Sequence, residues 1–201
     1  MLTYMVIKGK IKPSYMDKIN LNDLKKNLHN LIKQKAFFKE KITLASGKAS
    51  DYYIDARLVT LMPEGSYLVA SIILEMIKDD GFKAIGGPTI GADPIVGAIA
   101  SLGYLNKKPI NTFIVRKQPK EHGKRRQIEG PEIKPGSKAI LIDDVATTGG
   151  SLVDAVKLLA KDNIEVIKAV VIVDRQEGAK ENLAKVNCPL VSIFTAKDFL
   201  N

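Results

Sequence analysis

The chain contains a single cysteine, Cys188, and this scarcity excludes two kinds of site. One cysteine cannot form an intramolecular disulfide, and it cannot supply a cysteine-based metal cluster. The sequence also lacks an apolar run of the roughly 18–20 residues that a transmembrane helix needs. Its lysine-rich first residues lack the apolar stretch of a secretory signal peptide. We therefore expect a cytoplasmic protein that does not enter a membrane.

Linkers, repeats and low-complexity tracts are also absent, which excludes solenoid architectures and argues against a second domain. A length of 201 residues suits one domain, and an apolar fraction of 45% suffices for a sizeable core. Residues 1–20 show no clear periodicity, and we expect them to form an N-terminal extension. The sequence therefore predicts a single globular domain over residues 1–201.

Acidic residues are the scarcer charge, with 22 against 31 lysines and arginines, so the net charge is +9. This excess suits nucleic acid, a membrane surface or a polyanionic small molecule. Residues 116–126, here the basic loop, hold six cations and one acid, more than half of the net positive charge. A solvated surface loop would explain this run as well as a phosphate-binding one. The surrounding motifs must decide between them.

Short apolar strands alternate with helices along most of the chain, a pattern typical of a parallel sheet covered on both faces. A helix is expected from about Asn22, and residues 41–57 favour two strands around a turn at 46–50. Further helices are expected at 61–80, 94–102 and 151–161. The expected strands of the sheet are 83–86, 110–115, 138–142, 166–173 and 191–194. This is an α/β fold.

Ligands of open α/β sheets bind outside the carboxyl ends of the strands, so the loops that follow the strands are the candidate sites. The strongest signal is residues 139–151, AILIDDVATTGGS. Small residues let backbone N–H groups converge on an anion, and the helix N-terminus adds free donors. The adjacent acids Asp143 and Asp144 suit the hydroxyls of a sugar. A helix capped by a threonine or serine is the alternative, but it leaves the two acids unexplained.

This segment resembles the 5-phosphoribosyl-1-diphosphate motif of type I phosphoribosyltransferases. The resemblance implies that Asp143 and Asp144 hold the ribose hydroxyls and that residues 146–151 hold the 5-phosphate. The basic loop, continued by Ile128-Glu129-Gly130, resembles the mobile catalytic loop of orotate phosphoribosyltransferases, which closes over the diphosphate. The implied catalytic residues are Lys120, His122, Asp143 and Asp144. The implied 5-phosphoribosyl-1-diphosphate contacts are Arg116, Lys117, Lys120, His122, Asp143, Asp144, Val145, Ala146, Thr147, Thr148, Gly149, Gly150 and Ser151.

Two further segments resemble the same family. Residues 46–48 and 52–57 resemble its N-terminal hood, to which we expect residues 22–57 to contribute. Residues 173–178 resemble the strand end whose arginine, here Arg175, meets the orotate carboxylate, with Thr147 as a second orotate contact. An ion pair of Arg175 with Asp174 or Glu177 is the alternative. Many bacterial members have a lysine where this chain has Ala45. Many also have a lysine in the loop that corresponds to residues 87–93, which contains none here.

The resemblance implies a type I phosphoribosyltransferase fold and the transfer of a phosphoribosyl group to orotate in pyrimidine biosynthesis. It also implies Mg²⁺ held mainly through the substrate, with no direct protein ligand, and a homodimer that shares the catalytic loop across subunits. Two alternatives stay open. One is a phosphoribosyltransferase for another base. The other is a non-catalytic regulator on this fold that binds nucleic acid, although residues before Asn22 are too few for a helix-turn-helix domain.

Overall fold

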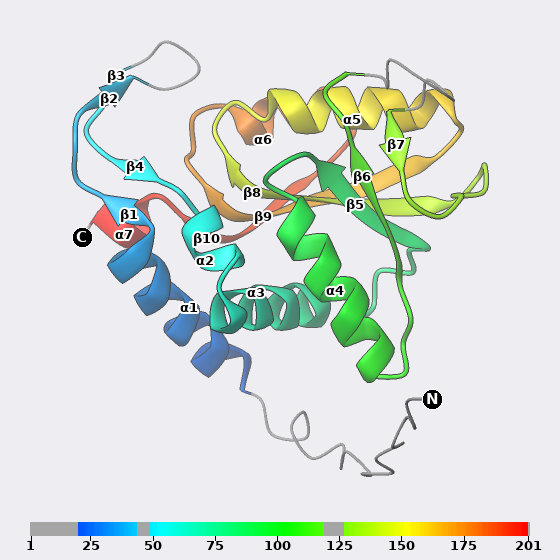
Figure 1. Ribbon diagram of the computed structural model, residues 1–201. Coiled ribbons are helices and arrows are strands. Elements are labelled where there is room, and N and C mark those ends of the chain that lie inside the picture. The colour runs from blue at the N-terminus through cyan, green and yellow to red at the C-terminus, as the bar shows by residue number, and fades with distance from the viewer. Residues whose placement is uncertain (1–19, 44–48, 119–126, 201) are drawn as a thin grey trace, which may run out of the picture.

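The computed structural model describes residues 20–43, 49–118 and 127–200 (Figure 1). The helices are α1 (Leu21–Lys35), α2 (Arg57–Thr60), α3 (Pro63–Met76), α4 (Asp93–Leu105), α5 (Gly150–Lys161), α6 (Ala179–Ala184) and α7 (Lys197–Leu200). The strands of the main sheet are β5 (Ala84–Pro88), β6 (Asn111–Val115), β7 (Ile128–Glu129), β8 (Lys138–Ala146), β9 (Glu165–Asp174) and β10 (Leu190–Thr195). No helix in this described part is long and apolar enough to cross a membrane.

The six-stranded main sheet has the order β10-β9-β8-β5-β6-β7. Its neighbouring strands are parallel, except that β7 runs antiparallel to β6 at the edge. The chain enters the sheet at β5, adds β6 on one side, and then adds β8 on the other. The direction of strand addition therefore reverses between β5 and β8. Ligands of open α/β sheets bind at this switch point, beyond the carboxyl ends of the two strands.

Helices cover both faces of the main sheet, as the sequence pattern predicts (Figure 1). One apolar core lies between the sheet and α1, α3 and α4, and a second lies under α5 and α6. The central strands read as continuous apolar runs because they are buried on both faces. Val170 to Val173 of β9, for example, have no exposed surface at all. The predicted α/β class is confirmed.

The hood, residues 22–57, packs beside one end of the main sheet and contains four two-residue strands (Figure 1). β1 (Phe37–Phe38) pairs antiparallel with β4 (Tyr53–Ile54), and β2 (Ile42–Thr43) pairs antiparallel with β3 (Ala49–Ser50). The antiparallel strands predicted for residues 41–57 are present, but the turn predicted at 46–50 is wrong at residues 49 and 50, which form β3, and residues 46–48 lie outside the described residues. α1 begins where the Asn20 side chain accepts a hydrogen bond from the backbone of Asn22. It buries Leu24, Leu28 and Ile32 on its inner face.

The structure departs from the sequence prediction in a few elements. The helix expected at 61–80 is shorter, beginning at Pro63 and ending at Met76, and α2 precedes it. β8 continues to Ala146, through the two acids, instead of ending at residue 142. The short elements β7, α6 and α7 were not predicted. Each of these three spans six residues or fewer, too few for a periodic apolar pattern to show.

Candidate active site

Asp143 and Asp144 lie on β8 at the switch point, and both are partly buried. The backbone N–H of Asp144 donates to Oδ1 of Asp143 at 2.9 Å, and the N–H of Val145 donates to Oδ1 of Asp144 at 2.7 Å. Burial raises the pKa of Asp143 well above its ordinary value, and the neighbouring Asp144 carboxyl raises it further. Burial also raises the pKa of Asp144. The pair is therefore costly to ionise and is suited to accept hydrogen bonds from a bound group.

Two cations lie close enough to act on this acid pair. Arg57 lies at the start of α2, where its Nε donates to Oδ1 of Asp55 at 2.8 Å and its Nη2 donates to Oδ2 at 3.1 Å. Its positive charge lowers the pKa of Asp144 against the larger effect of burial. Lys117, at the end of β6, acts in the same direction on Asp143. The sequence pattern placed Arg57 only within the hood segment 52–57. Its effect on the acids was not predicted, because it depends on how the hood folds.

The loop at residues 146–151 joins β8 to α5. The residue that precedes α5 is Gly149, in the left-handed region with φ of 72°, and no described side chain caps this helix. The alternative of a threonine or serine cap is therefore wrong. The backbone N–H groups of the first helical turn are left for another acceptor, and a phosphate suits them. Asn182 of α6 steadies the loop by donating to the carbonyl of Thr148 at 3.0 Å.

Residues 87–93, predicted as a loop, include the last two residues of β5 and the first residue of α4, and the connection between them faces the acid pair. A Cβ added at Gly91 would overlap the carboxylates of both Asp143 and Asp144, so a side chain at this position requires the two acids to move. Gly87 is equally confined, since its Cβ would overlap the carbonyl of Ile142. The peptide bond between Thr89 and Ile90 is cis. The main chain of this loop therefore lies directly against the acids, which leaves backbone groups to form that wall of the crevice.

A cleft of about 500 Å³ joins the base of the basic loop to α5. Arg116, Lys117 and Gln127 line one side of it, and Ser151 with Lys157 and Lys161 line the other. The side chain of Gln127 donates to the carbonyls of Arg116 and Lys117, which fixes the point where the basic loop leaves the sheet. The structure therefore brings Arg116 and Lys117 to the same cleft as Ser151. Lys120 and His122 lie outside the described residues.

Arg175 lies immediately after β9 and is buried, with 3% of its side chain exposed. Its Nε donates to Oε1 of Glu177 at 2.7 Å, and its Nη2 donates to Oγ of Ser50 at 3.0 Å. Its guanidinium carbon lies 4.3 Å above the ring of Tyr52. The ion pair with Glu177 that the sequence left as an alternative is present. It leaves Nη1 and one hydrogen of Nη2 for a further acceptor, so the pair does not exclude carboxylate binding.

Arg175 also connects the end of β9 to the end of β8. Its backbone N–H donates to the carbonyl of Ala146 at 2.9 Å. Thr147 follows Ala146 directly, so Thr147 and Arg175 project from neighbouring strand ends. The sequence pattern offered Glu177 as a partner of Arg175 but gave Ser50 and Tyr52 no specific role. The signal it had was their place in the hood motif.

The described residues contain no group of three or more histidine, cysteine, aspartate or glutamate side chains that could hold a metal ion. Asp143 and Asp144 are two hard oxygen donors, the type of ligand that Mg²⁺ prefers. Mg²⁺ commonly binds through one or two carboxylates and completes its shell with substrate oxygens and water. The residues at the switch point therefore fit such an ion only together with a bound polyanion.

Comparison with known proteins gives a consistent result. The family model described as Phosphoribosyl transferase domain matches residues 61–197. The chain is 40% identical over 177 residues to the orotate phosphoribosyltransferase of Rhodopseudomonas palustris (strain TIE-1), covering 87% of this chain and 95% of that protein. The crystal structure of the Mycobacterium tuberculosis H37Rv orotate phosphoribosyltransferase with Fe(III) dicitrate is similar, with a TM-score of 0.77, 32% identity, and coverage of 89% and 99% of the two chains. The crystal structure of that enzyme with 5-phospho-alpha-D-ribosyl 1-diphosphate is also similar, with a TM-score of 0.71 and 27% identity. The match covers 88% of this chain and 92% of that chain.

Proposed function

The chain belongs to the orotate phosphoribosyltransferases of the phosphoribosyl transferase domain family, and on that premise we propose how its residues perform the reaction. The protein transfers the phosphoribosyl group of 5-phosphoribosyl-1-diphosphate to orotate, a step of pyrimidine biosynthesis. The products are orotidine 5′-phosphate and diphosphate. One observation carries the residue assignment: the acid pair, the uncapped N-terminus of α5 and Arg175 meet at the carboxyl ends of β8 and β9.

The ribose 5-phosphate occupies the phosphate side of the crevice in this proposal. Asp143 and Asp144 accept hydrogen bonds from the vicinal hydroxyls of the ribose. The backbone of residues 146–151, with the hydroxyls of Thr147, Thr148 and Ser151, donates to the 5-phosphate at the start of α5. The ligand hydroxyls compensate a pair of acids that burial disfavours in their ionised form. The same residues therefore select a sugar phosphate over a simple phosphate.

Orotate occupies the base side. Arg175 offers its Nη1 and the second hydrogen of Nη2 to the orotate carboxylate, and such charge-assisted pairs are among the stronger hydrogen bonds. Thr147 supplies a second contact from the adjoining strand end. Glu177 and Ser50 hold the guanidinium in place, so its orientation is fixed before the base binds. A base without a carboxylate would leave Nη1 and the second hydrogen of Nη2 of this buried arginine without an acceptor, which favours orotate over uracil or a purine.

The chemistry is a displacement at C1 of the ribose. The ring nitrogen of orotate forms the new bond to C1 and releases its proton to the departing diphosphate, while the C1–oxygen bond breaks and its electron pair leaves with diphosphate. Arg116, Lys117, Lys120 and His122 place positive charge where the leaving diphosphate gains negative charge. Bound Mg²⁺ supplies charge neutralisation of the diphosphate oxygens. Residues 87–93 contain no lysine. The other contacts to the diphosphate therefore come from the backbone N–H groups of these residues and from the cations of the basic loop.

We propose residues 1–201 as one phosphoribosyltransferase domain, with residues 1–20 as an extension and residues 22–57 forming the hood. We also propose a homodimer in which the basic loop serves the site of the neighbouring subunit. The reaction would take place in the cytoplasm, without nucleic acid or membrane as a partner. The first relatives found are matched over nearly their whole length, which supports one catalytic domain.

The proposed reaction has a direct test. Purified protein is mixed with orotate, 5-phosphoribosyl-1-diphosphate and Mg²⁺, and orotate is followed by its ultraviolet absorbance. We expect loss of orotate only when all three are present, and we expect a chelator to stop it. Uracil, adenine and hypoxanthine in place of orotate test the base assignment. Turnover of one of these without turnover of orotate would reject the base site while leaving the sugar-phosphate site intact.

The confinement of Gly91 gives a second prediction. Replacing Gly91 by alanine should raise KM for 5-phosphoribosyl-1-diphosphate roughly 10- to 100-fold, because the new methyl group displaces the carboxylates of Asp143 and Asp144. Steady-state kinetics measure the change. Gly97→Ala is the matched control, because a Cβ there meets nothing within 4 Å. Equal kinetics in the two variants would show that the position of the acids does not matter for binding.

A further inference from the structure

Arg175 stands at one end of a column of stacked rings that reaches across the molecule to α7. Its guanidinium lies over Tyr52, and the Tyr52 ring stacks on Phe37 at a centroid distance of 5.8 Å and an interplanar angle of 26°. Phe37 in turn stacks on Phe199 at 6.0 Å and 25°. His29 closes the column, parallel to Phe199 within 9° at 4.8 Å. His29 lies on α1, Phe37 on β1 and Phe199 on α7, whereas Tyr52 directly precedes β4 and Arg175 directly follows β9.

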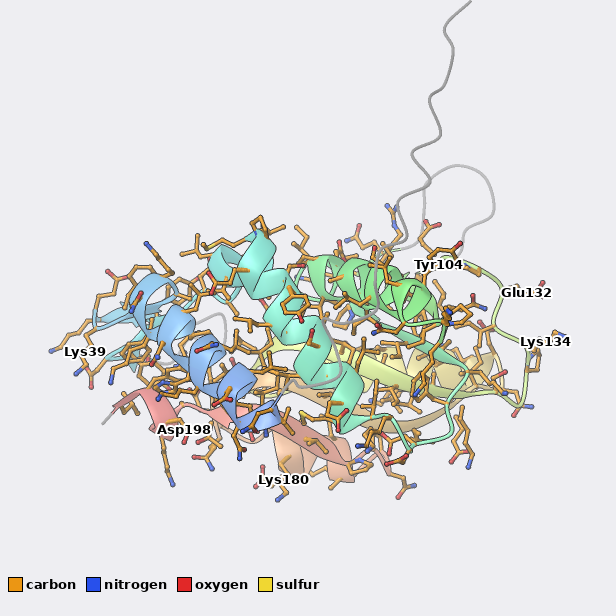
Figure 2. All side chains as sticks on the ribbon, turned by 90° about the horizontal axis from the view of Figure 1, so that it is seen from below. Lys39, Tyr104, Glu132, Lys134, Lys180 and Asp198 are labelled. Atoms are coloured by element: carbon orange, nitrogen blue, oxygen red, sulfur yellow. The ribbon has the colours of Figure 1, made fainter. Side chains whose placement is uncertain are left out.

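The far end of the column is firmly held. Phe199 has no exposed surface, although α7 has only four residues. The Nε2–H of His29 donates to the carbonyl of Asp198 at 2.8 Å, which fixes α7 against α1. Figure 2 shows the labelled Asp198 beside α1, and Figure 1 shows α7 next to β1 and the end of α1. The Asp198 carboxylate accepts from the backbone and hydroxyl of Thr195 at 2.7 and 3.0 Å, so the turn into α7 is also closed.

The same segment is tied to the base side of the crevice by its main chain. The N–H of Ala196 donates to the carbonyl of Asp174, the residue directly before Arg175, at 2.9 Å. Residues 196–199 are therefore linked to the Arg175 region in two ways, directly through the backbone of Ala196 and indirectly through the ring column. Phe199, Phe37 and Tyr52 all lie outside residues 61–197, the part that the general family model matches. We therefore connect these three rings with the hood and base binding rather than with the sugar-phosphate site.

We infer that Phe199 is a positioning residue for orotate: through Phe37 and Tyr52 it sets the place of the Arg175 guanidinium. The inference rests on the proposed role of Arg175 in binding the orotate carboxylate. The column fixes the cation from the face, while Glu177 and Ser50 fix it from the edge. The ring contacts of Phe199 go to His29, Phe37 and Phe194, which lie on α1, β1 and β10 and not on the segment that joins β8 to α5. Its loss therefore acts on the base and spares the sugar phosphate.

The test compares Phe199→Leu with Phe194→Leu, two substitutions of the same kind in the same region. Phe194 meets Phe199 edge-on, at 76°, and is not part of the stacked column. We expect Phe199→Leu to raise KM for orotate about 3- to 10-fold, the scale of one aromatic contact, with kcat and KM for 5-phosphoribosyl-1-diphosphate within about twofold of wild type. Phe194→Leu should leave all three constants within that margin. Leucine keeps the core apolar, and the thermal midpoint of each variant confirms that it is folded.

A double-mutant cycle then tests whether Phe199 acts through Tyr52. If it does, Tyr52→Leu combined with Phe199→Leu raises KM for orotate no further than Tyr52→Leu alone, whereas independent effects would multiply. An unchanged KM for orotate in Phe199→Leu, or an equal change for both substrates, would overturn the inference. The same holds if Phe194→Leu raises KM for orotate as much. Failure of the wild-type protein to consume orotate would instead reject the proposed function, so the two failures are distinguishable.

Discussion

Replacing Asp143 and Asp144 together by asparagine is expected to lower kcat/KM for 5-phosphoribosyl-1-diphosphate by about 10²- to 10⁴-fold, the loss of two hydrogen bonds to charged acceptors. Asparagine keeps the size of each side chain and its bonds to the neighbouring backbone N–H groups. It presents a neutral carbonyl and an amide where the ribose hydroxyls need acceptors. Steady-state kinetics at saturating orotate measure the effect. A loss below tenfold would move the ribose site away from β8.

The same double variant should be more stable than the wild type. Burial raises the pKa of both carboxyls in the folded protein, so their ionisation costs stability as pH rises from the unfolded pKa through the folded pKa. Asparagine removes that cost. At pH 7 we expect the thermal midpoint to rise by about 2–4 °C, which corresponds to ~1 kcal/mol in a domain of this size. Near pH 3, where both carboxyls are protonated in either state, the two proteins should melt together.

Replacing Lys120 by alanine is expected to lower kcat about 10²- to 10³-fold, as the loss of one positioned donor to developing charge does in other enzymes. KM for orotate should change little, because Arg175 and Thr147 are the base contacts in the proposed site. Lys134→Ala is the control: Lys134 is an exposed lysine beyond the basic loop (Figure 2). An unchanged kcat in Lys120→Ala would remove the basic loop from the mechanism.

The Lys120→Ala variant also tests the shared loop. In a mixture with the Asp143→Asn/Asp144→Asn variant, each mixed dimer contains one chain with intact acids and one with an intact loop. If the loop serves the neighbouring subunit, equal amounts should recover about one quarter of the wild-type activity after exchange of subunits. If each loop serves its own chain, no site in the mixture is complete and the activity stays at the level of the separate variants.

The sheet and its loops were predictable because each central strand is a continuous apolar run that ends at polar or small residues. The end of β8 was not predictable in this way. Two acids interrupt the apolar pattern, yet Asp143 pairs with Val171 and Val145 with Val173, because main-chain pairing does not depend on the side chain. The phosphate side of the site was predictable for a different reason. All of its residues lie within a few positions of each other in the chain.

The base side depends on contacts between distant segments, and the sequence has no local signal for these. Ser50 and Arg175 are 125 positions apart but share a hydrogen bond. Arg57 acts on Asp144 only because the hood folds over the carboxyl end of the sheet. The ion pair of Arg175 with Glu177 lies within one turn of chain and was foreseen as an alternative. Tertiary packing decides which of these local possibilities the residues adopt.

The hood strands β1 to β4 form two ladders of only two residue pairs each, separate from the main sheet. An isolated two-stranded ladder is marginal in water, so side-chain packing on α1 and α7 must hold the hood closed. Amide hydrogens of the hood should therefore exchange with solvent through small local openings, while those of β8 and β9 exchange only when the domain unfolds. The crevice wall formed by β8 and β9 is therefore permanent, whereas the wall formed by the hood can open locally. A sugar phosphate that binds the permanent wall can thus be in place before the base is enclosed.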